Sequence, residues 1–176
     1  MKLSKRCEYG LRALIDLSFA HQAGRERVSI AAIAEHEQIP VKFLEQILLQ
    51  LKEAGWLTSK RGKDGGYALT PAGAQVAIGT VVRHVDGPLA PIACVSKGGY
   101  VPCTCPDEDH CGLRLLMTDV HAAVSRLLDR TTLAEVVEIT LRRFRRDGIA
   151  PPFADGASSK VRKATHRSSR RSRRGA

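Results

Sequence analysis

Four of the five cysteines lie close together in the stretch CVSKGGYVPCTCPDEDHCGLR, spaced C-x8-C-x-C-x5-C. Thiolate sulfur is a soft ligand that suits iron-sulfur clusters and zinc, and a shared cation relieves the repulsion among several thiolates. Structural zinc sites more often use paired C-x2-C or C-x4-C knuckles, which this stretch lacks. The pattern therefore predicts an iron-sulfur cluster, either 2Fe-2S or 4Fe-4S, which the prepared protein can lack. The alternatives are a metal-free thiol loop and a disulfide.

The sequence identifies three of the four cluster ligands and leaves several candidates for the fourth. Cys94, Cys105 and Cys111 supply three ligands, and the fourth could be Cys103, His110 or a side chain from a second protomer. A ligand of a different chemical type can raise the reduction potential of the centre and make it easier to lose. Such lability would suit a sensor.

The segment before this loop has the pattern of a helix-turn-helix. A first helix is expected from residue 4 to 22, with Arg12 and Asp16 opposite its apolar side and Cys7 as a packed thiol. Ser29 is a good N-cap for a short second helix. After a brief turn, VKFLEQILLQLKEAG carries an apolar stripe and ends at the capping glycine Gly55. Two helices joined by so short a turn are the helix-turn-helix signature.

A β-hairpin is expected directly after the second of these helices. In WLTSKRGKDGGYALT, two strand-like runs flank a basic, glycine-rich loop at residues 62–66. The predicted fold is therefore mainly α, a winged helix-turn-helix with a small β-hairpin wing and a long C-terminal dimerisation helix.

Two groups of residues could contact double-stranded DNA. Lys42, Glu45 and Gln46 lie off the apolar stripe of the recognition helix, where Glu45 could accept a hydrogen bond from cytosine and Gln46 could pair with adenine. Basic residues at the start of the first helix and on the wing would meet phosphates, which sets affinity without reading sequence. These residues are Lys2, Lys5, Arg6, Lys60, Arg61 and Lys63.

The second half of the chain is expected to mediate dimerisation. After a helix at 78–85 and a loop, the segment 112–130 carries an apolar seam every three or four residues, and Thr132 with Glu135 predicts a capping box for a last helix. The seam consists of Leu113, Leu116, Val120, Val124 and Leu127. The predicted organisation is a DNA-binding domain at 1–88, a cysteine-rich cluster-binding loop at 89–111, dimerisation helices at 112–147 and a basic disordered tail at 148–176.

The formal net charge of +10 is unevenly distributed. Residues 160–176 contain eight Lys or Arg and no acidic residue, so residues 1–159 carry only 10 − 8 = +2. DNA affinity of the body must therefore come from local basic patches. A sequence-independent nucleic-acid-binding protein driven by the tail is an alternative of a different class. The chain lacks an apolar run that could span a membrane, so we expect a cytoplasmic protein. A thiol enzyme using Cys105 or Cys111 would need a base, for which His110 and His121 are the histidines close in sequence. The sequence has no Ser/His/Asp arrangement and no phosphate-binding glycine loop, so we expect that the protein is not an enzyme.

Several stretches resemble the Rrf-type bacterial regulators, a family that includes the iron-sulfur cluster regulator, the nitric-oxide-sensing repressor and the cysteine metabolism repressor. They are YGLRALIDLS, IPVKFLEQILLQLKEAGWLTSKRGKDGGYAL, VVRHVDGPLAPIACV, CGLRLLMTDVHAAV and TTLAEV. The resemblance covers roughly residues 1–140. It implies a homodimer on a palindromic operator, with the recognition helix in the major groove and the wing in the minor groove.

The resemblance also bears on the cluster. It implies ligation by Cys94, Cys105 and Cys111, with a fourth ligand that is either a histidine shortly after the last cysteine or an acidic side chain from helix one of the partner. Arg114 stands where that histidine is expected, whereas Glu8 could serve from the other protomer. Some family members have no cluster. We therefore predict a DNA-binding transcriptional regulator, a repressor controlled by an iron-sulfur cluster or by thiol redox state. The alternative is a cluster-free regulator controlled by a partner protein or small molecule.

Overall fold

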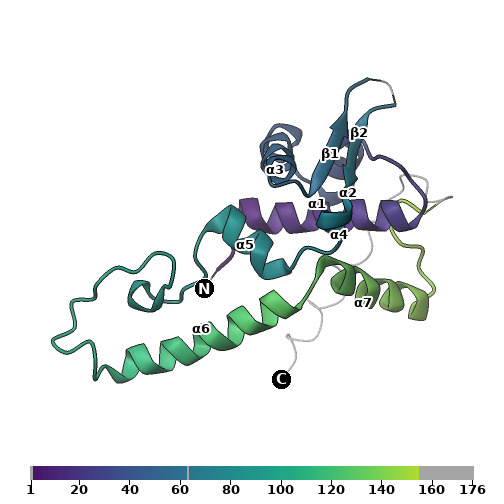
Figure 1. Ribbon diagram of the computed structural model, residues 1–176. Coiled ribbons are helices and arrows are strands. Elements are labelled where there is room, and N and C mark those ends of the chain that lie inside the picture. The colour runs from purple at the N-terminus through teal and green to yellow at the C-terminus, as the bar shows by residue number, and fades with distance from the viewer. Residues whose placement is uncertain (1, 63, 155–176) are drawn as a thin grey trace, which may run out of the picture.

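The computed structural model describes residues 2–62 and 64–154. Figure 1 shows a helical body from which a two-stranded hairpin and one long helix project in different directions. Helix α1 crosses the middle of this body, and α3, α5 and α7 all pack against it. The mainly α class with a small β-hairpin is confirmed. In chain order the elements are α1 (Lys5–Gln22), α2 (Ile30–Glu37), α3 (Val41–Glu53), β1 (Leu57–Lys60), β2 (Gly66–Leu69), α4 (Pro71–Ala74), α5 (Ile78–Asp86), the 3-10 turn η1 (Ala93–Val95), α6 (Gly112–Arg130) and α7 (Leu133–Arg146).

Helices α1 and α3 share the centre of the hydrophobic core. The apolar stripe of α3 is fully buried, and burial of one such leucine side chain contributes about 1.5–3 kcal/mol to stability. At the crossing of the two helices, a Cβ placed on Gly10 would lie 3.3 Å from Ile47, so the small residue permits close approach. The buried stripe consists of Leu44, Ile47, Leu48 and Leu51. It fixes α3 against α1 and leaves the opposite edge of α3 facing solvent.

The predicted helix boundaries are confirmed by their capping contacts. The Ser29 hydroxyl accepts a hydrogen bond from the backbone of α2 at 3.2 Å, and Thr132 with Glu135 forms a reciprocal capping box on α7. Gln38 adopts the left-handed backbone conformation with φ 54° in the turn between α2 and α3, and Gly55 does so after α3 with φ 79°.

The hairpin is tied to the start of α2. Its two strands pair antiparallel, and Val28 exchanges backbone hydrogen bonds with Tyr67 of β2 at 2.8 and 2.9 Å. A Cβ at Gly66 would lie 2.5 Å from the Val28 carbonyl oxygen, so this position requires glycine. The wing is therefore held by the same segment that begins the helix-turn-helix.

Three features differ from the sequence prediction. A short helix, α4, follows β2. The sequence did not predict it, because four residues are too few to show a helical hydrophobic period. Asp16, expected on the solvent side of α1, is only 1% exposed. The disordered tail was expected from residue 148, yet Phe153 packs against the hydrophobic core. Residues 155–176, which hold the rest of that predicted tail, lie outside the described residues.

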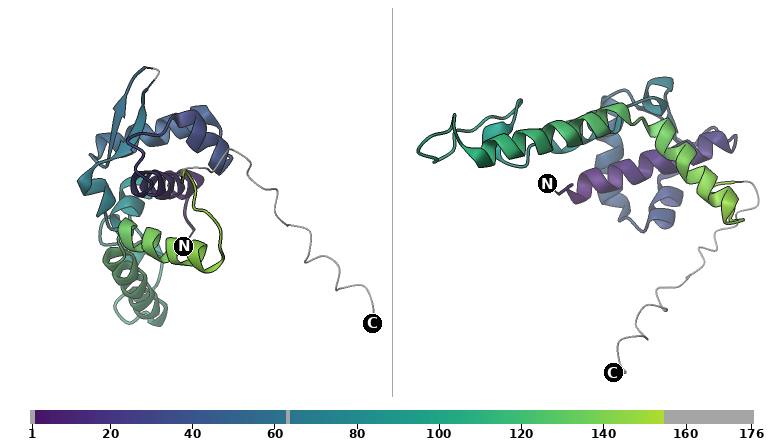
Figure 2. Two further views of the ribbon diagram at one scale, coloured as in Figure 1. Left: turned by 90° about the vertical axis from the view of Figure 1, so that its right-hand side faces the viewer. Right: turned by 90° about the horizontal axis from the view of Figure 1, so that it is seen from below.

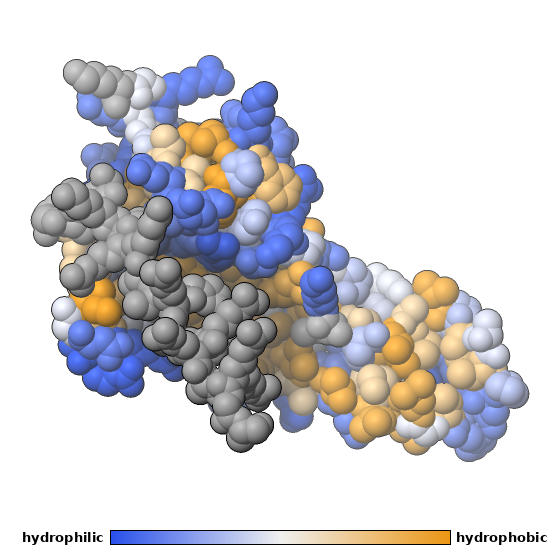
Figure 3. All heavy atoms as spheres, turned by 180° about the vertical axis from the view of Figure 1, so that it is seen from behind, coloured by the Kyte–Doolittle hydropathy of each residue, from blue (hydrophilic) through white to orange (hydrophobic). Residues whose placement is uncertain are grey.

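Helix α6 projects from the body as an arm (Figure 1). None of its residues is buried. Four apolar residues of the predicted seam are 40–66% exposed, namely Leu113, Leu116, Val120 and Leu127. Val124, the remaining member, is half-buried. Figure 3 shows hydrophobic residues gathered over this arm. No described helix combines the length and the apolar character needed to cross a bilayer.

A partly buried ion pair joins α1 to α2. The carboxylate of Asp16 lies 2.8 Å from Nδ1 of His36, and Glu37 lies 3.6 Å from the same nitrogen. Hydrogen bonds to Asp16 and Glu37 raise the pKa of His36 to about 10. Burial raises the pKa of Asp16 to about 6 against the opposing effect of its bond to His36. Protonated His36 therefore stabilises the contact between these two helices.

This pair predicts a pH dependence of stability. A histidine whose pKa is higher in the folded chain stabilises fully below its unfolded value of 6.5 and loses that contribution as the pH rises to about 10. We expect the free energy of unfolding to fall by about 2 kcal/mol more in the wild type than in His36→Gln over this interval. Urea unfolding at a series of pH values measures it. Equal pH dependence in the two proteins would show that folding does not raise the pKa of His36.

Candidate DNA-binding surface and cysteine loop

The solvent-facing edge of α3 presents the predicted base-reading residues. Lys42, Glu45 and Gln46 are all exposed on the side opposite the buried stripe. Side chains at these positions lie on neighbouring turns, because residues three and four apart share a helix face. The structure thus brings the three together on one accessible edge.

Contacts at both ends fix the orientation of α3. Phe43 in its first turn packs edge to face with Tyr9 of α1, with ring centroids 5.8 Å apart. In its last turns, Gln50 donates a hydrogen bond to the His84 carbonyl at 3.2 Å. Helix α3 also packs against β1 of the hairpin. Burial raises the pKa of Tyr67 on the wing, and the negative charge of Glu45 raises it further.

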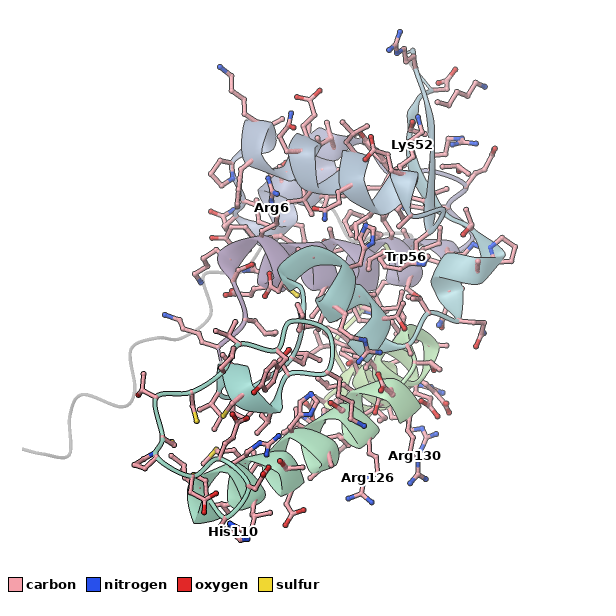
Figure 4. All side chains as sticks on the ribbon, turned by 60° about the vertical axis from the view of Figure 1, so that its left-hand side comes forward. Arg6, Lys52, Trp56, His110, Arg126 and Arg130 are labelled. Atoms are coloured by element: carbon pink, nitrogen blue, oxygen red, sulfur yellow. The ribbon has the colours of Figure 1, made fainter. Side chains whose placement is uncertain are left out.

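The predicted phosphate-binding residues lie around this edge. Lys60 and Arg61 are exposed on the hairpin, and Lys2, Lys5 and Arg6 are exposed at the start of α1. Arg6 projects on the side where α3 packs on α1 (Figure 4). Lys63 lies outside the described residues. Lys5 is partly neutralised, because it pairs with Glu8 at 2.8 Å.

Two basic residues near this surface were missed by sequence reasoning. Lys52 is exposed in the last turn of α3 (Figure 4). Arg27 immediately precedes the Val28 bridge, and its Nε and Nη1 are buried without a hydrogen-bond partner in the described chain. Arg27 lies between α1 and α2, where the sequence has no helical period from which its burial could be predicted. Lys52 lies in α3, so its exposure could have been predicted from the helical period.

Three of the four loop cysteines, Cys103, Cys105 and Cys111, lie in the last part of the loop, and Cys111 is the N-cap of α6. The backbone N–H of Cys105 donates to the sulfur of Cys103 at 3.4 Å, and the thiol of Cys105 lies within electrostatic reach of Cys103 and Cys111. Cys94 is buried and lies within electrostatic reach of Cys103. The donor set has the chemistry of a thiolate-bound group, because all four side chains are soft sulfur ligands.

The sulfurs are not drawn into a compact set. Within the described residues, the three potential metal-ligand side chains whose ligand atoms all lie within 4.8 Å of one another are Asp16, His36 and Glu37, and none of them is a loop cysteine. Their charges are balanced by one another and by Arg12. The cysteine loop would therefore have to contract around a bound cluster.

The thiols differ in acidity. Cys111 is the N-cap of α6, and the nearby backbone N–H groups of Arg114 and Leu113 hold its pKa below the ordinary value, as expected at a helix N-terminus. Hydrogen bonds to Cys103 and Cys111 raise the pKa of Cys105 to about 12. Burial raises the pKa of Cys7 to about 11, which agrees with the packed thiol predicted in α1.

Arg114 occupies the position where the resemblance leads one to expect a histidine. Its Nε lies 3.4 Å from a carboxylate oxygen of Glu108, and its Nη1 lies 3.7 Å from Asp109. Glu108 also accepts a hydrogen bond from Tyr100 at 2.9 Å. Arg114 therefore braces the loop instead of offering a ligand.

The other candidate ligands are held by charge partners. Glu8 bonds Lys5 at 2.8 Å and Arg12 at 3.5 Å, and the hydrogen bond from Lys5 holds its pKa low. His110 is exposed at the loop tip and pairs with Asp107 at 2.7 Å. Cys103 is the local fourth donor, and its sulfur already accepts a hydrogen bond from the backbone N–H of Cys105.

Comparison with known proteins identifies the class of the chain. The family model Rrf2, described as an iron-dependent transcriptional regulator, matches residues 3–139. The chain is 37% identical over 137 residues to an rrf2-like HTH-type transcriptional regulator of Rhodobacter capsulatus, covering 77% of this chain and 91% of that protein. It is 31% identical over 137 residues to the HTH-type transcriptional regulator IscR of Escherichia coli, covering 78% and 80%.

Solved structures agree with this result. The global cysteine regulator CymR of B. subtilis superimposes with a TM-score of 0.60 at 28% identity, covering 79% of this chain and 98% of that one. IscR of T. potens gives a TM-score of 0.60 at 25% identity, covering 86% and 93%. These proteins are regulators, which confirms the prediction that the chain is not an enzyme. The winged helix-turn-helix, the curated relatives and the family match together show that this chain belongs to the Rrf2 family of transcriptional regulators.

Proposed function

We propose that this regulator binds a palindromic operator as a homodimer, with α3 of each protomer in a major groove and the wing in the adjacent minor groove. The observation that carries the proposal is the exposed edge of α3, where Lys42, Glu45 and Gln46 lie on a helix fixed from behind by a buried stripe. Glutamate can accept a hydrogen bond from cytosine N4, and glutamine can pair with adenine in the major groove.

The basic residues around α3 would bind the DNA backbone. Lys60 and Arg61 on the wing and Lys2, Lys5 and Arg6 on α1 surround the reading edge, with Lys63 added from the sequence. Such contacts orient a protein on the duplex and supply salt-dependent affinity.

Helix α6 would form the dimer interface. Its exposed leucines are costly to leave in water, and a two-fold axis would bury the same stripe from both protomers. Arg126 and Arg130 project from the C-terminal end of α6, next to α7 (Figure 4), in a recess that also contains Glu135 and Glu138 of α7. These charges could pair across the axis, so that two recognition helices are held at the spacing of two half-sites.

The cysteine loop would hold an iron-sulfur cluster through Cys94, Cys105 and Cys111, with Cys103 or Glu8 of a second protomer as the fourth ligand. When bound, such a cluster supplies a group that oxidants or iron shortage can alter or remove. Because the loop lies between the DNA-binding body and α6, its contraction would change the angle between the two protomers. Operator affinity would then depend on the state of the loop, and the regulator would act as a repressor in the cytoplasm.

Thiol oxidation without a metal is a second candidate for control. The closeness of Cys105 to Cys103 favours it, because neighbouring thiols can be oxidised to a disulfide. Iron and acid-labile sulfide in protein prepared without oxygen would support the cluster, and a colourless protein would support control by thiols, a partner protein or a small molecule.

The base-reading role is tested by Glu45→Ala. We expect discrimination at one base position of each half-site to relax by about 1–3 kcal/mol, because the lost carboxylate no longer selects cytosine. Fluorescence anisotropy on operator duplexes with single base changes measures this. The control is Glu53→Ala, which removes an exposed carboxylate from the other end of α3. Unchanged selectivity in Glu45→Ala would count against the assignment.

A further inference from the structure

Leu49 is an apolar residue on the mostly polar edge of the recognition helix. It lies just past the middle of α3 and is 46% exposed, between the fully buried Leu48 and the half-buried Gln50. Lone exposed leucines are common on protein surfaces, so the place of this one on the helix decides what it can do. The structure describes α3 in full, and its exposed residues are Val41, Lys42, Glu45, Gln46, Leu49, Lys52 and Glu53.

Leu49 lies in the middle of the edge that would read bases. At about 100° per residue, it is about 40° around the helix axis from Glu45 and about 60° from Gln46, on the side between them. With Lys42, these residues follow the i, i+3, i+4, i+7 spacing of a helix that lies in a major groove. Leu49 would therefore face a base pair next to those that Glu45 and Gln46 read.

The packing behind α3 keeps the Leu49 side chain at the surface. Leu48 and Leu51 are 0% exposed on the opposite side of the helix, and the Gln50 amide donates a hydrogen bond to the His84 carbonyl at 3.2 Å. A rotation of α3 that buried Leu49 would expose this stripe and break that hydrogen bond. Helices α6 and α7 lie on the other side of α1 (Figures 1 and 2), so neither covers the edge that carries Leu49.

The chemistry of a leucine side chain favours one base in the major groove. Thymine presents an apolar group there, its C5 methyl, and apolar side chains recognise it by packing against it. The groove edges of guanine, cytosine and adenine present hydrogen-bond donors and acceptors. Leucine has neither, so it would displace water from those groups without replacing the lost hydrogen bond. An apolar residue at this place therefore discriminates in favour of thymine.

We propose that Leu49 packs against the C5 methyl group of a thymine in each half-site and so selects thymine at that position. The proposal rests on the proposed function, because it requires α3 to lie in the major groove. It adds an apolar contact to the hydrogen bonds assigned to Glu45 and Gln46, and it extends the sequence that each protomer reads toward the C-terminal half of α3.

Deoxyuridine tests this contact, because it lacks the C5 methyl of thymidine and keeps the hydrogen bonds of the base pair. The half-site is first defined by selection from random duplexes with the full-length protein. Each thymine is then replaced by deoxyuridine, one position at a time in both half-sites, and affinity is measured by fluorescence anisotropy. Burial of one methyl-sized group contributes about fourfold, so we expect one position at which the wild type loses about tenfold or more over the two half-sites.

Variants of α3 assign the methyl contact to one side chain. Leu49→Ala should bind the thymine and deoxyuridine duplexes with affinities within about twofold of each other, as a double-mutant cycle requires of a removed contact. Leu49→Met keeps an apolar side chain and should retain most of the preference for thymine. Val41→Ala is the matched control, because Val41 is also 46% exposed but lies at the first residue of α3, and it should keep the wild-type preference. Thermal unfolding of each protein checks that the fold is kept.

The outcomes separate this inference from the proposed function. A wild type that selects an operator but tolerates deoxyuridine at every thymine, or selects half-sites without thymine, would overturn the methyl contact while leaving the regulator intact. A folded Leu49→Ala protein that keeps the wild-type preference, or loss of the preference in Val41→Ala, would also overturn it. Failure of the wild type to select any duplex would remove the proposed function, and this inference with it.

Discussion

Alanine in place of Cys94, Cys105 or Cys111 is expected to give a colourless protein when it is purified without oxygen. Each change removes one of the three thiolates that the proposed cluster needs. The loop thiols of the described chain do not form a compact set on their own, so they cannot compensate for a lost ligand. Loss of residues that merely support metal ligands already costs about 10- to 100-fold in metal affinity, so loss of a ligand should lower iron content by at least about tenfold. Iron and sulfide analysis with a visible spectrum measures this.

The control for these variants is Cys7→Ala, which removes a thiol buried in α1 far along the chain from the loop. It should keep the chromophore. Cys103→Ala and Glu8→Gln then identify the fourth ligand, because the one that ligates should alter the spectrum. Full iron content in all three primary variants would exclude Cys94, Cys105 and Cys111 as ligands.

Leu116→Glu should separate the dimer and weaken operator binding by about 100-fold or more. Leu116 is 56% exposed in the middle of the apolar stripe of α6, so a carboxylate there would be buried without a partner in the proposed interface. A monomer engages one half-site, and the gain from linking two sites is typically 10²- to 10⁴-fold. Analytical ultracentrifugation and anisotropy on a two-site duplex test both consequences.

Thr118→Glu is the matched control, because it places the same charge two residues further on, at the other side of the helix. It should remain dimeric. A dimeric Leu116→Glu protein with normal operator affinity would move the interface away from this stripe.

Local signals in the sequence were sufficient for most of the fold. Ser29, the Thr132 and Glu135 pair and Gly55 each satisfy backbone groups at a helix end, so residue type alone marks the boundary. The apolar stripe of α3 also predicted which side is exposed. These features depend on contacts between residues close in the chain.

Features that depend on distant contacts were missed. Asp16 was assigned to the solvent side of α1, because nothing in its own neighbourhood shows that His36, 20 residues later, pairs with it. The packing of Phe153 on His36 was missed for the same reason, because the two residues are far apart in the chain. The bracing role of Arg114 likewise appears only once the loop is folded against α6.

Selection of binding sequences from a pool of random duplexes tests the central claim most directly. If the exposed edge of α3 reads bases, the wild type should enrich two inverted half-sites, and replacing Lys42, Glu45 and Gln46 by alanine should erase that enrichment while leaving salt-sensitive affinity. Recovery of no motif by the wild type, or of the same motif by the triple variant, would contradict the account.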